Sequence, residues 1–162
     1  MFAAERLDEQ RDILYVEPGQ LLVCTEPRRL RTILGSCVSV CLHDPALRHG
    51  GMNHFMLPTS PVADVISTRY GDEAMQGLLE RLERLGSQRR DLCASVYGGA
   101  RVLFAMSELM HLGKRNVEFA LEWLAQHNIP VVASGVLGQK ARRLDFDIAT
   151  GECSERLLGG GV

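Results

Sequence analysis

The stretch TILGSCVSVCLHDP, residues 32–45, decides how the chain is organised. Its part from residue 37 to 43 is apolar and rich in β-branched side chains, which is typical of a buried strand, and Pro45 ends that strand. A second strand is predicted in HGGMNHFMLP, residues 49–58. Because the loop between the two segments is short, we expect the two strands to pair as neighbours.

Outward from this pair, the chain alternates between strand and helix patterns. Residues 25–31, TEPRRLR, fit neither pattern and are predicted to be a basic connector. The order predicts an α/β (α+β) fold, a single-domain layered α/β sandwich with a mixed β-sheet core. Hydrophobic periodicity predicts helices at 70–85 and 114–127 and strands at 13–16, 20–24, 92–100, 129–134 and 143–148, with a last strand after Gly151.

Length and composition set the broad class. The chain has 162 residues, 46% of them hydrophobic, and a net charge of −2, which is typical of one globular domain, residues 1–162, without a bias toward nucleic acid. Residues 1–12 and 158–162 are predicted to be flexible. The basic clusters at Arg28, Arg29 and Arg31 and at Arg142 and Arg143 are predicted to be solvated surface.

The N-terminal residues carry charges instead of an apolar signal core, and no apolar run is long enough to span a bilayer. We therefore expect a cytoplasmic protein that does not insert into membranes. The five cysteines are an odd number and predict free thiols instead of a disulfide framework.

Cys37 and His54 are the candidate nucleophile and base. Cys37 follows Gly35-Ser36 at the mouth of a strand, where free backbone N–H groups can hold a developing oxyanion. His54 lies in the neighbouring predicted strand, so its imidazole can meet the thiol if both side chains share a face. Thr32 can orient the imidazole as a third member. Gly35, Ser36 and Asn53 are further candidates for oxyanion or supporting contacts.

Each of these residues also has a structural interpretation. Cysteines in apolar strands most often pack without reacting, and a histidine followed by Phe55-Met56-Leu57 is most often a satisfied core residue. Thr32 by default is a strand residue. We expect no metal site, because Cys37 and Cys41 would lie about 13 Å apart on one strand, and no cofactor, because the glycine-rich segments match no phosphate or dinucleotide motif.

Several blocks in order along the chain resemble the chemoreceptor glutamine deamidase family, CheD. These blocks cover most of residues 13–151: LGSCVSVCLHDP (34–45), GGMNHFMLP (50–58), YGGA (97–100), LGKRN (112–116) and FDIATG (146–151). The resemblance implies a three-layer α/β sandwich. It also implies a cysteine-dependent protein-glutamine glutaminase that converts glutamines of methyl-accepting chemotaxis receptors to glutamate through a thioester, releasing ammonia.

The resemblance implies a site as well. The family's nucleophile corresponds to Cys37, its histidine to His54 and its upstream threonine to Thr32. The substrate would be the cytoplasmic helical region of the receptors, and a CheC-type phosphatase is a possible partner. Two other functions stay open: a regulatory binding module for such a phosphatase, or a receptor glutamate methylesterase. Residues 134–140, SGVLGQK, depart from the family's Asp-x-Gly-Gly-like turn, so receptor selectivity is expected to differ more than catalysis.

Overall fold

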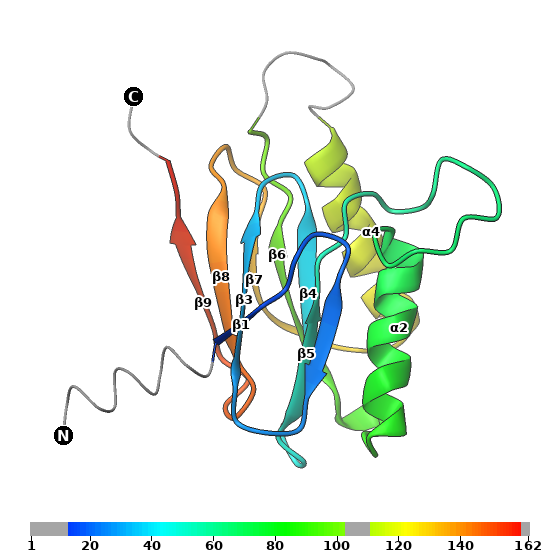
Figure 1. Ribbon diagram of the computed structural model, residues 1–162, viewed down its shortest axis with the longest axis vertical. Coiled ribbons are helices and arrows are strands. Elements are labelled where there is room, and N and C mark those ends of the chain that lie inside the picture. The colour runs from blue at the N-terminus through cyan, green and yellow to red at the C-terminus, as the bar shows by residue number, and fades with distance from the viewer. Residues whose placement is uncertain (1–12, 103–110, 160–162) are drawn as a thin grey trace.

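The computed structural model describes residues 13–102 and 111–159, which form strands, two α-helices and a short 3-10 helix. The helices cover one side of the strands, and the described termini lie on the other side (Figure 1). In chain order the elements are β1 Ile13–Tyr15, β2 Leu21–Cys24, β3 Arg29–Leu34, β4 Val38–Asp44, β5 His49–Asn53, α2 Gly71–Arg84, η1 Arg89–Asp91, β6 Cys93–Gly98, α4 Leu112–Gln126, β7 Val131–Val136, β8 Arg142–Asp147 and β9 Cys153–Leu157.

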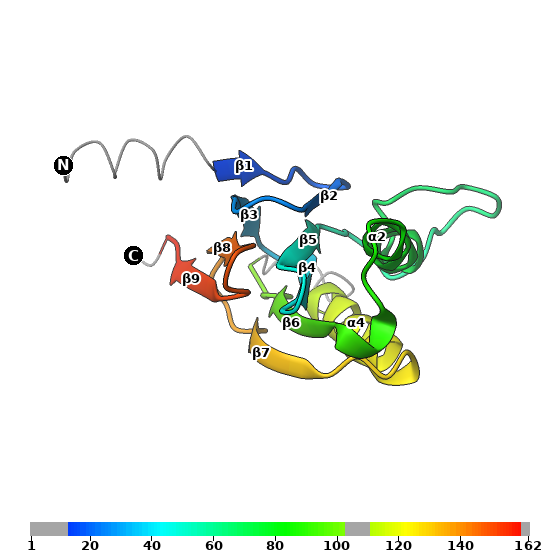
Figure 2. The same ribbon diagram turned by 90° about the horizontal axis from the view of Figure 1, so that it is seen from below.

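The strands form two mixed sheets. One has five strands in the order β2-β5-β4-β6-β7, in which only β6 and β7 are parallel. The other has four strands in the order β1-β3-β8-β9, in which only β1 and β3 are parallel. Figure 2 shows the resulting layers, with α2 and α4 against the five-stranded sheet and the four-stranded sheet on its other face.

Two hydrophobic cores hold these layers together, and β4 contributes to both because every one of its residues is buried. Its even-numbered residues Val38, Val40 and Leu42 pack with the helices, whereas Cys41 packs in the core between the two sheets. Side chains alternate between the faces of a strand, so the odd-numbered face of β4 is the one turned toward the four-stranded sheet. This face carries the candidate site.

Most of the predicted elements are confirmed, including both helices, the antiparallel pairing of β4 with β5, and the layered α/β fold. All five cysteines are free thiols, as predicted. The helix predicted at 70–85 spans Gly71–Arg84. The helix predicted at 114–127 begins slightly earlier, at Leu112. The flexibility predicted for residues 1–12 and 160–162 concerns residues outside the described ranges.

Three predictions are wrong. Residues 29–31 are not a connector but begin β3, in which Leu30, Thr32 and Leu34 are buried while Arg29, Arg31 and Ile33 turn outward. The alternation of buried and outward-facing residues runs from residue 29 to residue 34, so the segment 25–31 taken alone contains too little of it to be recognised as a strand. The strand predicted to reach residue 58 ends at Asn53. Arg142 is not solvated surface, because it is only 4% exposed and pairs with Glu155.

Candidate active site

The sheet register places Cys37 and His54 on the same face. Val38 and Phe55 form an antiparallel bridge that continues the pairing of β4 with β5. The same register sets Ser39 opposite His54, and Cys37 lies two residues from Ser39 on that face. Side chains related in this diagonal way are near neighbours in an antiparallel pair. The half-buried Cys37 packs against the core between the sheets, and His54 is 2% exposed.

Thr32 reaches the same space from the four-stranded sheet. Its hydroxyl lies 2.7 Å from Nδ1 of His54 and 2.7 Å from the carbonyl oxygen of Val16. Thr32 and His54 are both buried, so water does not compete for these contacts. Thr32 therefore lies on β3, His54 directly after β5 and Cys37 directly before β4. All three are on the side where the two sheets face each other.

These contacts determine the tautomer of His54. A hydroxyl has one proton, and the carbonyl of Val16 can only accept, so Thr32 donates to Val16. The hydroxyl oxygen must then accept a hydrogen bond from Nδ1–H of His54. The proton of the neutral imidazole is therefore on Nδ1, and Nε2 is left with a lone pair that can accept a proton.

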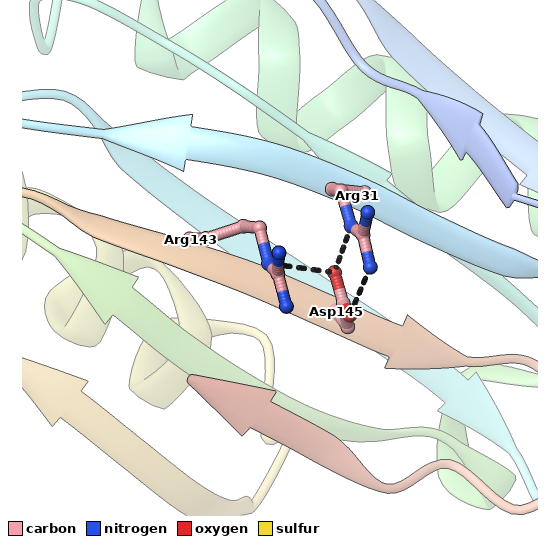
Figure 3. Close-up of polar contacts among 3 residues, drawn as sticks. All are labelled: Arg31, Arg143 and Asp145. Atoms are coloured by element: carbon pink, nitrogen blue, oxygen red, sulfur yellow. Dashed lines mark hydrogen bonds and ion pairs between the residues drawn. The ribbon is translucent and has the colours of Figure 1, made fainter. Parts of the chain in front are cut away.

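An ion-pair cluster lies on the outer face of the four-stranded sheet, between β3 and β8 (Figure 3). Arg31 donates from Nε to Oδ1 of Asp145 at 2.6 Å and from Nη2 to Oδ2 at 2.8 Å, and Arg143 lies 4.0 Å from the same carboxylate. This bidentate pair joins residues that are directly opposite in the β3–β8 register. A slip of one residue would turn Thr32 outward and break its contact with His54.

Backbone contacts hold the segment that carries Cys37. The carbonyl of Gly35 accepts from the N–H of Ala100, and the carbonyl of Cys37 accepts from the N–H of Gly99, both at 2.9 Å. Gly98 has a φ of 109°, and a Cβ there would collide with the carbonyl oxygen of Cys37. The glycines of YGGA thus allow the turn after β6 to lie directly against the cysteine.

Burial shifts both candidate reacting groups toward their neutral forms. It raises the pKa of the Cys37 thiol, an effect that a hydrogen bond from the N–H of Cys37 itself opposes. It lowers the pKa of His54 from 6.5 to about 4. At neutral pH the resting pair is therefore an uncharged thiol and an uncharged imidazole, and charge forms only when a proton moves from sulfur to nitrogen.

Comparison with known proteins identifies the family of the chain. The model of a family described as CheD chemotactic sensory transduction matches residues 56–156. A protein of Anaeromyxobacter dehalogenans named probable chemoreceptor glutamine deamidase CheD 1 is 43% identical over 145 residues, which are 90% of this chain and 84% of that protein. The chain belongs to the CheD family.

Other CheD relatives are similar over nearly the same span. A probable chemoreceptor glutamine deamidase CheD of Ralstonia nicotianae is 44% identical over 91% of this chain and 64% of its own length. The corresponding protein CheD 1 of Shewanella oneidensis is 40% identical over 88% of this chain and 70% of its own length. Among solved structures, the hypothetical protein YfiH of Bacillus licheniformis aligns with a TM-score of 0.48 and 15% identity, over 78% of this chain and 60% of that chain.

No helix among the described residues of this CheD chain is long and apolar enough to cross a membrane. The described residues also contain no group of three or more His, Cys, Asp or Glu side chains that could hold a metal ion.

The three predicted supporting residues lie in different places. Gly35 and Ser36 form the segment before Cys37, whereas Asn53 faces the helices. The Asn53 amide accepts from the N–H of Val40 and donates to the carbonyl of Ala74. Asn53 therefore holds β4 and α2 together on the face opposite His54.

The sequence prediction missed Asn116 of α4. Its Nδ2 donates to the carbonyl oxygen of Ser36 at 3.0 Å and to that of Met56 at 3.1 Å. The block LGKRN (112–116), which contributes to the family resemblance, is the signal that could have identified it.

Residues 134–140, which are expected to depart from the CheD pattern, comprise the end of β7 and the loop after it, and they lie beside the same turn. The N–H of Leu137 donates to the carbonyl of Gly98, and the N–H of Arg101 donates to the carbonyl of Gly138, both at 2.8 Å. The guanidinium of Arg142 donates to the carbonyls of Gly135 and Leu137. The altered residues 134–140 therefore border the Gly98–Gly99 turn, which contacts Cys37.

The lowered pKa of His54 predicts a pH-dependent stability. As pH falls from 6.5 toward 4, the unfolded chain binds a proton at this histidine before the folded chain does. The free energy of unfolding is thus expected to fall with pH in this window, by about 3 kcal/mol in total. Urea denaturation at several pH values between 4 and 7.5 measures this change. His54→Gln should remove this part of the slope, and parallel curves for the two proteins would contradict the assignment.

Proposed function

We propose that this protein is a protein-glutamine deamidase in which Cys37 is the nucleophile, His54 is the acid and base, and Thr32 orients the imidazole. Its substrates are glutamine side chains of chemoreceptors, as the names of its CheD relatives suggest. The observation that carries the proposal is the 2.7 Å contact between Thr32 and Nδ1 of His54, in the buried space that Cys37 borders. This contact leaves Nε2 free to accept the proton of the thiol.

The first half of the reaction forms a thioester. Nε2 of His54 takes the proton of Cys37 while the sulfur attacks the amide carbon of the glutamine side chain. The resulting oxyanion accepts from the N–H of Cys37. The imidazolium then protonates the amide nitrogen, the carbon–nitrogen bond breaks, and ammonia leaves.

The second half releases glutamate. His54, neutral again, takes a proton from water, and the hydroxide oxygen attacks the thioester carbon. The carbon–sulfur bond breaks as the imidazolium returns the proton to the sulfur. The net reaction consumes one amide and one water and yields one carboxylate and one ammonium ion, without a cofactor.

The proposal also covers the cellular compartment and the binding partners. The substrate glutamines are those of the cytoplasmic helical region of methyl-accepting receptors, so the protein acts in the cytoplasm. A CheC-type phosphatase is the proposed regulatory partner. A pull-down with purified CheC-type protein, run beside the activity assay, tests the partner separately from the chemistry.

The decisive experiment is to incubate the protein with receptor cytoplasmic fragments and to map the products by mass spectrometry. Deamidation raises the mass of each modified peptide, and ammonia appears in equal amount. Methylesterase activity would instead lower the mass of methylated peptides and release methanol. A regulatory binding module without activity would change neither the peptides nor the ammonia concentration.

Replacing Thr32 with valine tests the proposed orientation of the imidazole. The substitution keeps the shape but removes the acceptor for Nδ1–H of His54, so the tautomer with a free Nε2 loses its stabilisation. We expect kcat to fall about 10-fold to 100-fold, a smaller loss than that of the general base itself. Thr32→Ser keeps the hydroxyl and should recover most of the rate. Equal rates for the valine and serine variants would contradict the assigned role.

A further inference from the structure

Asn116 is a buried side chain that joins the two segments of the candidate site. It is 0% exposed, and its amide nitrogen donates to the carbonyls of Ser36 and Met56. Ser36 directly precedes Cys37, and Met56 follows His54 by two residues. Because both partners are carbonyl oxygens, only the NH2 group can face them, so the orientation of the amide is unambiguous.

Three consecutive carbonyls of the Cys37 segment are held in this way. Those of Gly35 and Cys37 accept from backbone N–H groups of the turn after β6, at 2.9 Å each. That of Ser36 accepts from Asn116, at 3.0 Å. Only the middle contact depends on a side chain, so it is the one that a substitution can remove.

The carbonyl of Ser36, the middle one of the three, determines the direction of the N–H of Cys37, which belongs to the same peptide unit. A trans peptide unit is planar, and its C=O and N–H point in opposite directions. There are no cis peptide bonds among the described residues, so holding the carbonyl of Ser36 toward α4 turns the N–H of Cys37 away from α4. No described backbone carbonyl accepts from that N–H.

The second amide atom of Asn116 supports a specific role. Oδ1 is buried and has no hydrogen-bond partner within the described part of the chain. A buried acceptor without a partner destabilises the fold, so a residue chosen for stability alone would not leave one. An unpaired Oδ1 follows directly if the position requires both hydrogens of an amide NH2 group to bond the two carbonyls.

We propose that Asn116 is a positioning residue of the deamidation reaction: by holding the carbonyl of Ser36, it aims the N–H of Cys37 at the oxyanion that forms from the glutamine amide. This inference rests on the proposed function. Asn116 acts through the Ser36–Cys37 peptide and does not itself contact the substrate. Its contribution therefore belongs to the transition state, where the oxyanion develops, and not to substrate binding.

Asn116→Leu, which removes both donors at similar volume, tests this inference. We expect kcat for ammonia release from receptor fragments to fall about 10-fold to 100-fold, with KM unchanged within about twofold. Leu124→Ala is the matched control, because Leu124 is buried in the core between the helices and the five-stranded sheet, about two turns further along the same helix. Rates are expressed per folded molecule, with the folded fraction measured by circular dichroism.

Asn116→Asp is the second variant, and it decides the question if the leucine variant does not fold. A protonated carboxyl keeps one donor, whereas an ionised one has none and repels the two carbonyls. Its kcat relative to the parent should therefore fall as pH rises through the pKa of the new carboxyl, a change that a purely structural role would not produce.

The outcomes separate the two proposals. An active parent with an unchanged kcat in Asn116→Leu, or with the same loss in Leu124→Ala, overturns the role of Asn116. The role of Asn116 is also overturned if the kcat of Asn116→Asp relative to the parent stays constant across pH. A parent that releases no ammonia from any receptor fragment overturns the proposed function, and this inference with it.

Discussion

Cys37→Ala is expected to reduce ammonia release from receptor fragments by more than about 10⁴-fold, since removal of a nucleophile leaves only binding and the oxyanion donors to act. The sulfur is the only protein atom that forms a covalent bond to the substrate carbon in the proposed reaction. The side chain is half-buried at the edge of the core between the sheets, so its truncation should leave the fold intact. Mass spectrometry of the receptor peptides measures the loss of product.

Cys24→Ala is the matched control for this prediction. Cys24 is another half-buried free cysteine that packs against the same core, but it lies at the end of β2. Its truncation should leave kcat unchanged. Comparable losses in the two alanine variants, or full activity in Cys37→Ala, would rule out Cys37 as the nucleophile. Cys37→Ser should also be nearly inactive, because a hydroxyl gives up its proton to an imidazole much less readily than a thiol does.

His54→Gln is expected to lower kcat by about 10²-fold to 10⁴-fold, the range that general acid–base catalysis supplies. Glutamine remains polar and can donate to the hydroxyl of Thr32, but it cannot take the proton of Cys37. With the base gone, the thiol has no acceptor, and burial already raises its pKa. Single-turnover experiments should place the loss in formation of the thioester.

His43→Gln is the matched control for the base. His43 is buried like His54 but lies on β4, and its Nε2 contacts the carbonyl of Ile148 at 2.9 Å. It pairs with Gly50 and Cys93 in the sheet, away from the Cys37 end of β4. This variant should be less stable but should retain kcat per folded molecule. If it loses as much kcat as His54→Gln, the imidazole of His54 has no special role.

The neutral resting pair has a consequence for selectivity. Many reactive cysteines are stabilised as thiolates, whereas here burial favours the thiol of Cys37 and the uncharged imidazole of His54. In the proposed reaction, the thiolate then forms only together with attack on a positioned amide. This arrangement fits an enzyme that must act on a few glutamines without general reactivity toward other electrophiles.

The sequence was sufficient for most of the local structure and for naming candidate reacting residues. The apolar run before Asp44 predicted β4, and the stripe of Met75, Leu78 and Leu82 predicted α2. The run fits a buried strand by its length and its β-branched residues, and the stripe repeats with the period of a helix. The pairing of β4 with β5 was also predictable, since a short loop leaves neighbouring strands little other choice. Cys37, His54 and Thr32 could be named from residue chemistry and family resemblance.

Only the tertiary structure decided how the candidate site is assembled. The contact of Thr32 with His54 joins two different sheets, and the contact of Asn116 with Ser36 joins residues 80 positions apart. Asn53 is adjacent to His54 in sequence but faces the helices, because neighbouring side chains on a strand point to opposite faces. Local patterns specify which face of an element is apolar, but they do not contain the packing of one layer on the next. The tautomer of His54 and the direction of the Cys37 N–H are set by that packing.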